Sequence, residues 1–354
     1  VNQRYHATAM ASLILRGDLE SDGRALQDTR LVSVPLLVED DNGDSRSPEN
    51  RLFVDLVHTT LTRLLGGEEP LAADVFVVNF SIGVKDARFA GRISALARLL
   101  DWWAAREGVL FVISAGNIND NLALPGIRAG AFEQANGSER RQRVRAAMQA
   151  STFDRTLLAP AEALNGVTVG AISKDLGNHR PPAQAGIISL EGEGDTMPQV
   201  TSALGLGLHR TIKPDLLETG GRIEVRVWPN GHDTGLRPVY SQRTGLVAAA
   251  PGGGARGTKK SRGTSPAAAL TTRAILQAAQ ALTGQDGPYE GQELPRRMLA
   301  LLCRALAVNA ARWPDDARDL YNEERARLGG RQHARAKEEV CRYFGYGALV
   351  PELM

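Results

Sequence analysis

Cysteine is scarce in this sequence, which has only Cys303 and Cys341 among its 354 residues. Two isolated cysteines exclude the dense disulfide framework of a small secreted domain, and we expect both to be free, buried thiols. Unpaired thiols favour the cytoplasm as the location of the protein. Long apolar runs are also missing: none approaches the roughly 20 residues of a membrane-spanning helix. We therefore expect no association with a membrane.

An excess of charge is missing too. The sequence has 42 Lys and Arg residues against 40 Asp and Glu residues, a net charge of +2. This near balance of positive and negative charge gives no electrostatic reason to expect a nucleic-acid partner. The basic run ERRQRVR at 139–145 is therefore interpreted as a solvated helix face. The sequence carries no indication of the oligomeric state.

Recognisable metal and phosphate sites are absent as well. The six histidines are dispersed, without an HExxH motif or a Cys/His cluster, and no calcium-ligand pattern is evident, so no metal or cofactor is expected. The stretch PGGGARGTKKS at 251–261 resembles a phosphate-binding loop, but Thr258 stands where that motif requires lysine. A flexible surface loop is the better interpretation of this stretch.

Short β-rich runs alternate with longer amphipathic segments along the chain. This alternation predicts an α/β fold with a mainly parallel sheet and helices on both faces. We expect a single domain over 1–354, with probable insertions at 118–164 and 228–262, where periodicity weakens and loops are predicted. The predicted strands are 31–38, 74–80, 109–113 and 166–171, the predicted helices are 50–65, 91–106, 266–283, 294–311, 314–327 and 332–343, and an extended tail follows.

The stretch RGTSPAAAL at 262–270 places a serine directly before a predicted helix. Pro266 suits the first helical position, since a helix start leaves its N–H groups unpaired, and Ser265 would then lie at or beside the N-cap. Serine before a helix usually only caps it. The alternative is a hydroxyl that faces a cleft and reacts.

Three other polar residues occupy positions from which they could assist such a serine. His6 precedes small residues at the start of a predicted helix, and Ser81 and Asn117 each follow a predicted strand. The carboxyl ends of parallel strands share one rim of the sheet, where ligands bind. Imidazole can take the proton of a serine, and an Asn amide together with the N–H groups of a helix start can stabilise an oxyanion. His6, Asn117 and Ser265 thus offer a base, an oxyanion donor and a nucleophile.

At these residues the chain resembles the subtilisin-like serine proteases, or subtilases. Their histidine, asparagine and serine motifs correspond in order to HAT at 6–8, AGN at 115–117 and GTS at 263–265. Three further stretches agree: DVFVVNFSIG at 74–83, KPDLLETGG at 213–221 and GYG at 345–347. The resemblance covers nearly the whole chain. It implies a three-layer subtilisin-like fold and a serine endopeptidase that needs no cofactor.

The resemblance also implies a role for individual residues. Ser265 would be the nucleophile, His6 the general acid and base, and Asn117 the oxyanion donor. Extended peptide or protein substrate would pair as an added strand with one stretch of backbone, and a second stretch would line the pocket for the side chain before the scissile bond. The first stretch is Ser81, Ile82 and Gly83, and the second is Ser114, Ala115 and Gly116.

One member of the family's triad has no counterpart in this sequence. The family places an aspartate before the histidine, and no Asp precedes His6. We expect the strand that carries this aspartate to lie upstream of residue 1. A catalytically inactive, subtilase-like scaffold that binds peptide or a partner protein remains the alternative. An esterase of the α/β-hydrolase class is disfavoured, because the GxSxG elbow is missing and His333, which follows the serine, suits a solvated helix.

Overall fold

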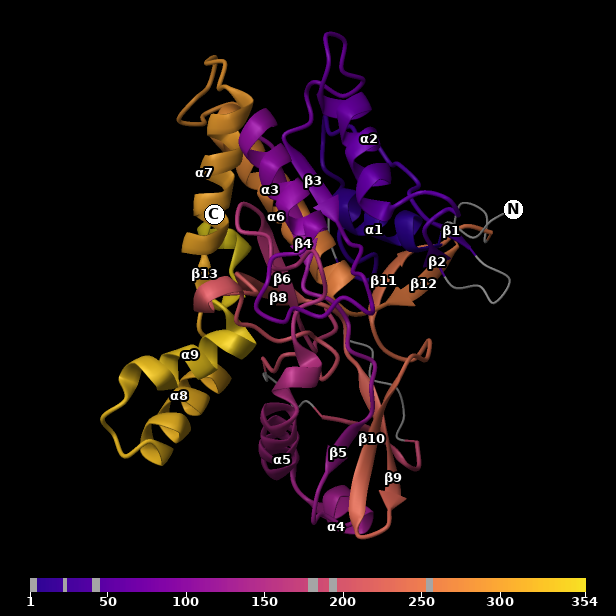
Figure 1. Cartoon of the computed structure of the whole chain (residues 1–354), viewed down its shortest axis with the longest axis vertical. Helices are drawn as coiled ribbons and strands as arrows, with labels where there is room; N and C mark the ends of the chain where they lie inside the picture. Colours follow the sequence, from indigo (N-terminus) through magenta and orange to yellow (C-terminus); the bar gives the residue numbers. More distant parts are fainter. Residues whose placement is uncertain (1–4, 22–23, 40–44, 178–183, 191–195, 253–256) are drawn as a thin grey trace.

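A six-stranded, mainly parallel sheet lies at the centre of the protein, in the order β13-β14-β8-β6-β4-β3 (Figure 1). All neighbours in it are parallel except β13 and β14. The computed structural model describes residues 5–21, 24–39, 45–177, 184–190, 196–252 and 257–354. The six strands are β3 (Val77–Phe80), β4 (Leu110–Ser114), β6 (Val167–Ile172), β8 (Leu216–Thr219), β13 (Ala311–Arg312) and β14 (Ala348–Leu349).

Helices cover both faces of this sheet, as the strand–helix alternation predicts. Along β4, Leu110 and Val112 pack with residues of α6 and α7, whereas Phe111 and Ile113 pack with residues of α2 and α3. Since successive strand residues point to opposite faces, the two helix pairs lie on opposite sides. The helices are α1 (Tyr5–Arg16), α2 (Phe53–Leu65), α3 (Ala95–Glu107), α4 (Ala129–Gln134), α5 (Gly137–Ala150), α6 (Thr264–Thr283), α7 (Arg296–Asn309), α8 (Asp315–Arg327) and α9 (His333–Phe344).

The two regions predicted as loops contain regular structure, so that prediction is wrong. Both contribute strands to a second, antiparallel sheet of order β5-β10-β9-β7, and α4 and α5 also fall in 118–164. Whether these regions are insertions stays a prediction. The remaining strands are β1 (Val38–Glu39), β2 (Ser45–Arg46), β5 (Leu122–Leu124), β7 (Ile187–Ser189), β9 (Glu224–Asn230), β10 (Asp233–Val239), β11 (Leu246–Ala249) and β12 (Thr258–Ser261).

The glycine-rich stretch at 251–261 is also more regular than predicted. Its end, Thr258–Ser261, is strand β12, which pairs antiparallel with β11 and leads directly toward Ser265. Residues 253–256 lie outside the described residues. A backbone ladder with β11 fixes a segment that composition alone marked as a loop.

Most other predicted elements are confirmed to within a few residues, and the two cysteines are free and buried. The predicted strand 31–38 is wrong. Only its last residue, Val38, belongs to a strand, and Leu31, Val32 and Val34 are exposed. The segment has the apolar composition of a strand, but residues 31–37 pair with no strand in the described part of the chain, and β3 lies at the edge of the sheet as described.

Candidate active site

The serine predicted as nucleophile is the second residue of α6. The helix begins at Thr264, after Gly263, so Ser265 is not the N-cap and Pro266 is not the first helical residue, contrary to the sequence prediction. Gly263 has φ +116°, and a Cβ there would lie 2.7 Å from Asn117 Oδ1. Its N–H donates to the Gly220 carbonyl at 2.8 Å. Only glycine fits this turn, and the turn brings the helix start against Asn117.

Asn117 is held by the residue that precedes the serine. Its Oδ1 accepts the backbone N–H of Thr264 at 3.0 Å and the Thr264 hydroxyl at 3.3 Å. The Thr264 hydroxyl oxygen in turn accepts the N–H of Gly116 at 3.2 Å. Among the described residues, the Asn117 side-chain NH₂ donates no hydrogen bond. The amide is therefore fixed through its oxygen, and its NH₂ group is available to a ligand.

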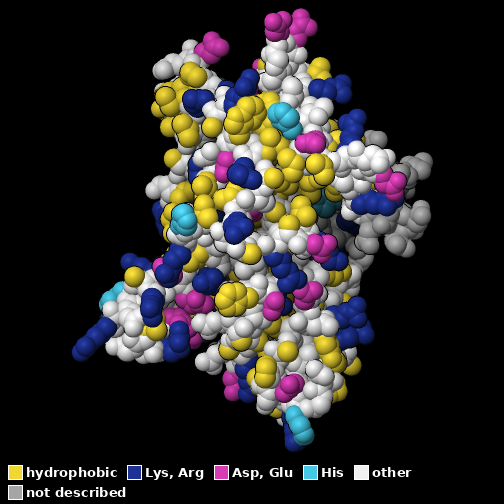
Figure 2. All heavy atoms as spheres, viewed as in Figure 1, with side chains coloured by type: hydrophobic (Ala, Val, Ile, Leu, Met, Phe, Trp, Pro, Cys, Tyr) yellow, Lys and Arg dark blue, Asp and Glu magenta, His cyan; other side chains and the backbone are white. Residues whose placement is uncertain are grey.

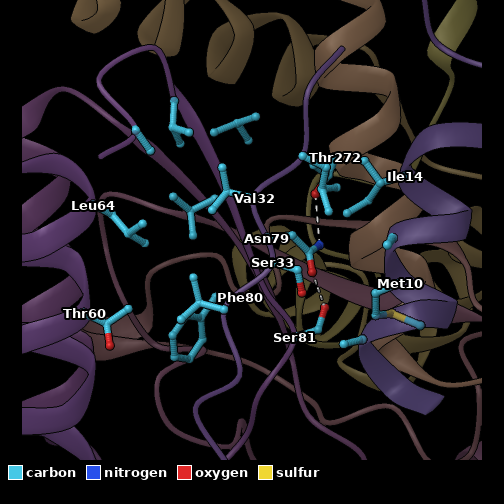
Figure 3. A pocket seen from close by; sticks show the side chains of 18 of the residues that line it. Met10, Ile14, Val32, Ser33, Thr60, Leu64, Asn79, Phe80, Ser81 and Thr272 are labelled. Carbon is cyan, nitrogen blue, oxygen red and sulfur yellow. Dashed lines mark hydrogen bonds between the residues drawn. The ribbon is translucent and has the colours of Figure 1, made fainter. Parts of the chain in front are cut away.

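Ser265 also lies against the strand end that carries Ser81. Its Oγ donates to the Ser81 carbonyl at 3.4 Å, a long hydrogen bond. The Ser81 hydroxyl donates to Asn79 Oδ1 at 2.7 Å, and Asn79 Nδ2 donates to the Thr272 hydroxyl at 3.0 Å (Figure 3). Asn79 thus ties the end of β3 to α6. The roles of Asn79 and Thr264 were not predicted from the sequence, although both lie inside the motifs DVFVVNFSIG and GTS.

His6 approaches the same place from α1. This helix packs on α6 through apolar contacts that include Leu13 and Ala269. His6 and Ser81 both line one cavity of about 280 Å³. The structure gives no hydrogen bond between His6 and Ser265, although both are described. The two side chains are therefore not hydrogen-bonded to each other in this structure.

The surroundings of His6 disfavour its charged form. His6 is exposed at the surface, yet neighbouring protein atoms displace part of its water shell, and this desolvation is the main cause that lowers its pKa. The positive charge of Lys259 lowers the pKa further. Lys259 lies on β12, with its Nζ 5.3 Å from the centre of the Tyr5 ring. Within the described part of the chain, no carboxylate pairs with His6 or with Lys259.

The cavity beside His6 is mostly apolar and lies beyond the open edge of β3 (Figure 3). The exposed segment around Val32, helix α2 and helix α1 form its other walls. Figure 2 shows hydrophobic side chains gathered over α2 and α3 in the same part of the molecule. Representative lining residues are Met10, Val32, Leu61, Leu64, Phe80 and Ile82.

The second predicted substrate stretch, Ser114–Gly116, is buried. The carbonyl of Ala115 accepts the N–H of Leu158 at 3.1 Å. The Leu158 side chain lies so close to Gly116 that a Cβ on this glycine would be 2.6 Å from Leu158 Cγ. Ser81 contacts Ser265 and Asn117 contacts the preceding residue, Thr264, whereas the position of Leu158 was not predicted. A single leucine in a region of weak periodicity carries no signal that could have revealed it.

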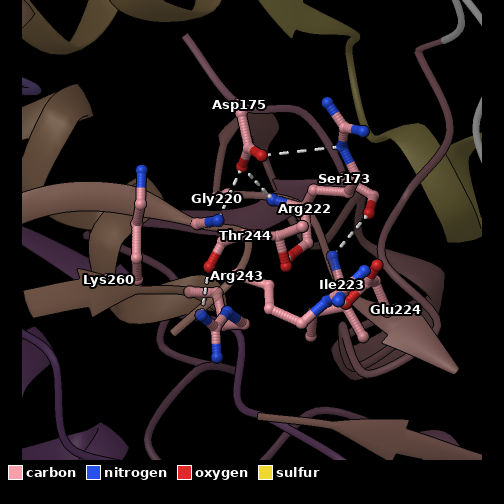
Figure 4. A network of polar contacts seen from close by, with 12 residues as sticks. Ser173, Asp175, Gly220, Arg222, Ile223, Glu224, Arg243, Thr244 and Lys260 are labelled. Carbon is pink, nitrogen blue, oxygen red and sulfur yellow. Dashed lines mark hydrogen bonds and ion pairs between the residues drawn. The ribbon is translucent and has the colours of Figure 1, made fainter. Parts of the chain in front are cut away.

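Charged groups behind β12 are paired with one another (Figure 4). Asp175 Oδ1 accepts the backbone N–H groups of Arg222 at 2.7 Å and Gly245 at 2.8 Å. Arg243 forms an ion pair with Glu224 at 3.3 Å. On β12 itself, Lys260 pairs with Glu20 at 2.8 Å. This network fixes the loops that lead into Gly263.

Neither a metal site nor a membrane-spanning helix occurs in the described residues. No group of three or more His, Cys, Asp or Glu side chains there could hold a metal ion. No helix in the same ranges is long and apolar enough to cross a lipid bilayer.

Comparison with known proteins decides the family. A model of the subtilase family, Peptidase S8, matches residues 1–347. The chain belongs to the subtilase family. Membership of this family implies serine peptidase activity, and therefore protein substrates. No curated protein sequence matches the chain significantly.

Several solved structures are similar to this chain. The chain is 14% identical to the prenylagaramide maturation protease PagA, with 99% of this chain and 80% of that chain covered and a TM-score of 0.50. A weaker likeness is to MycP1 with its N-terminal propeptide removed: the identity is 17%, 99% of this chain and 78% of that chain are covered, and the TM-score is 0.46. Another is to a cold-adapted subtilisin-like serine proteinase: the identity is 18%, 87% of this chain and 68% of that chain are covered, and the TM-score is 0.42. The likeness to PagA confirms the predicted α/β, subtilisin-like fold.

Proposed function

We propose that this subtilase is an endopeptidase that cleaves extended polypeptide with Ser265 as nucleophile, His6 as general acid and base, and Asn117 as oxyanion donor. The observation that carries the proposal is the hydrogen bond from Thr264 N–H to Asn117 Oδ1. This bond fixes the amide beside the helix start and leaves its NH₂ group without a partner among the described residues. An oxyanion site requires a hydrogen-bond donor that is fixed next to the serine and has no other partner.

The reaction has two steps, acylation of Ser265 and hydrolysis of the acyl-enzyme. His6 takes the proton of Ser265 Oγ as this oxygen bonds to the scissile carbonyl carbon, and the Asn117 NH₂ and the Ser265 N–H stabilise the oxyanion. The C–N bond then breaks, and the amine leaves with the proton that His6 returns. In the second step, water gives a proton to His6 as its oxygen attacks the acyl carbonyl carbon. The bond to Ser265 Oγ then breaks, the carboxylic acid leaves, and His6 returns the proton to Ser265. The backbone of Ser81, Ile82 and Gly83 holds the substrate as an added strand.

The geometry of the apo site is looser than this reaction demands. Within the described residues Ser265 Oγ donates to the Ser81 carbonyl alone, at 3.4 Å, and must turn toward His6. Catalytic hydrogen bonds in enzymes without substrate are often long and tighten in the complex. Binding of a substrate strand beside Ser81 is the event that we expect to redirect the hydroxyl.

The carboxylate that orients His6 comes, in this proposal, from a strand upstream of residue 1. Two observations support a place for it: among the described strands β3 pairs with β4 alone, and the apolar cavity of about 280 Å³ lies beyond its other edge. A buried parallel strand is apolar and would fill such a cavity. Its carboxyl end would lie on the rim of the sheet that Ser81 occupies.

Labelling by a fluorophosphonate probe tests the proposal. We expect the full-length gene product to be labelled and its Ser265→Ala variant not to be. Residues 1–354 alone should react about 10⁴-fold more slowly, since that is the typical cost of losing the orienting carboxylate. Equal labelling of both forms would refute the upstream carboxylate, and its source would then lie within residues 1–354.

The alternative is a peptide-binding scaffold without catalysis. It is favoured by the absence of a carboxylate paired with His6 among the described residues. Folded full-length protein that stays unlabelled, yet binds extended peptide, would decide for this scaffold.

A further inference from the structure

The two stretches of backbone expected to bound the pocket for the side chain before the scissile bond nearly touch each other. These are Ser81–Gly83, at the end of β3, and Ser114–Gly116, at the end of β4. A Cβ built on Gly83 would lie 3.9 Å from the Cα of Gly116, which is van der Waals contact. The two walls thus continue side by side at the spacing of the neighbouring strands β3 and β4, and any side chain that enters the pocket has to lie over them.

One buried side chain fills the space that remains. Leu158 is only 4% exposed. A Cβ on Gly83 would meet Leu158 Cβ at 3.4 Å, and one on Gly116 would meet Leu158 Cγ at 2.6 Å. The side chain therefore lies against both walls at once. Glycine at each position is what lets the leucine come so close.

Backbone hydrogen bonds hold Leu158 in place from both sides. Its N–H donates to the carbonyl of Ala115 at 3.1 Å, so it is tied to one wall. The next residue, Ala159, donates to the Ala87 carbonyl at 2.9 Å and accepts the N–H of Val84 at 2.9 Å, so the segment is tied to the chain that continues the other wall. Leu158 is thus part of a fixed structure and is not a side chain that can easily swing away.

We propose that Leu158 closes the pocket for the residue before the scissile bond and restricts this residue to glycine, alanine or serine. This inference deepens the proposed function and rests on it. Such a restriction follows from volume: a side chain with several more carbons would have to displace a leucine that is already packed at van der Waals distance. In pockets of this kind one methylene changes kcat/KM by about 10- to 200-fold.

The test is a gain of function. We would digest a peptide mixture of known sequence with the full-length protein and identify the residue before each cut. Wild-type protein should cut after Gly, Ala and Ser. Leu158→Ala should also cut after Leu, Met and Phe, with the kcat/KM ratio of large to small residues raised at least about 10-fold. Leu158→Val, a smaller change, gives an intermediate ratio if the alanine variant folds poorly.

Leu157→Ala is the matched control, because it removes the same atoms from a neighbouring buried leucine that packs in the cluster of α2 and α3. Its cleavage profile should equal that of wild type. Frequent wild-type cuts after large residues would overturn the proposal, as would an unchanged profile in Leu158→Ala. Fluorophosphonate labelling of Ser265 in the same samples reports separately whether the proposed function holds.

A binding measurement keeps the inference testable if nothing is cut. In the Ser265→Ala background, acetyl-Ala-Ala-Pro-Ala should bind more tightly than acetyl-Ala-Ala-Pro-Phe. Adding Leu158→Ala should remove or reverse this preference. Equal affinities for both peptides in both backgrounds would overturn the role of Leu158, whatever the chemistry at Ser265.

Discussion

The two sides of Ser265 differ sharply in how tightly they are built. On the side of Asn117, three hydrogen bonds connect Asn117, Thr264 and Gly116. On the side of His6, the structure gives no hydrogen bond to the serine, and a cavity of about 280 Å³ opens next to the histidine. One side is fully packed and the other is open.

This difference separates two tasks of the site. Stabilising an oxyanion depends on donors that are fixed before the reaction begins, and the packed side provides them. Moving a proton depends on a base whose orientation and pKa are set by a partner, and the open side has no such partner among the described residues. We therefore expect substitutions on the packed side to affect both stability and activity, and substitutions on the open side to be mild until the orienting carboxylate is present.

The largest expected effect comes from Asn117. Asn117→Asp keeps an oxygen that can accept the Thr264 N–H but loses the NH₂ donor, and it should lower the rate of cleavage by about 10²–10³. Asn117→Ala loses both functions, so it should lower the cleavage rate similarly and also lower the melting temperature. Cleavage of a peptide substrate and thermal melting would be measured on both variants.

Asn119→Asp is the control, since it makes the same chemical change two residues along the chain. It should retain wild-type cleavage. Full activity in Asn117→Asp would mean that the donor is not used, and the packed side would then be a structural feature only.

A pair of stability measurements sharpens the comparison. Gly116 has φ +108°, and a Cβ there would meet Leu158 at 2.6 Å, so Gly116→Ala should lower the free energy of unfolding by about 2–4 kcal/mol. Val32 lines the open cavity and is 54% exposed, so Val32→Ala should change it by less than about 0.5 kcal/mol. Urea unfolding would measure both, and equal losses would show that the open side is as well packed as the other.

The sequence predicted the packed side better than the open one, for a physical reason. GTS and AGN are short motifs whose glycines and polar side chains contact one another, so the pattern itself specifies the local geometry. Composition alone predicts the strand at 31–38, but a strand also needs a neighbour to pair with, and the described residues provide none for 31–37. Leu158 lies far from both motifs in sequence, and only the folded chain reveals its contact with the two glycines.

The smallest expected effect concerns the charge next to His6. Lys259 lowers the pKa of His6, second to desolvation by neighbouring protein atoms, so Lys259→Met should raise this pKa. His6 accepts a proton only in its neutral form, which is present above its pKa. The acidic limb of the pH dependence of fluorophosphonate labelling should therefore move to higher pH in the variant, and an NMR titration of the His6 ring should move in the same direction. Lys260→Met removes a lysine that pairs with Glu20 and should leave both curves unchanged. A shift of equal size in the two variants would mean that the general charge of β12, and not the position of Lys259, sets the basicity of His6.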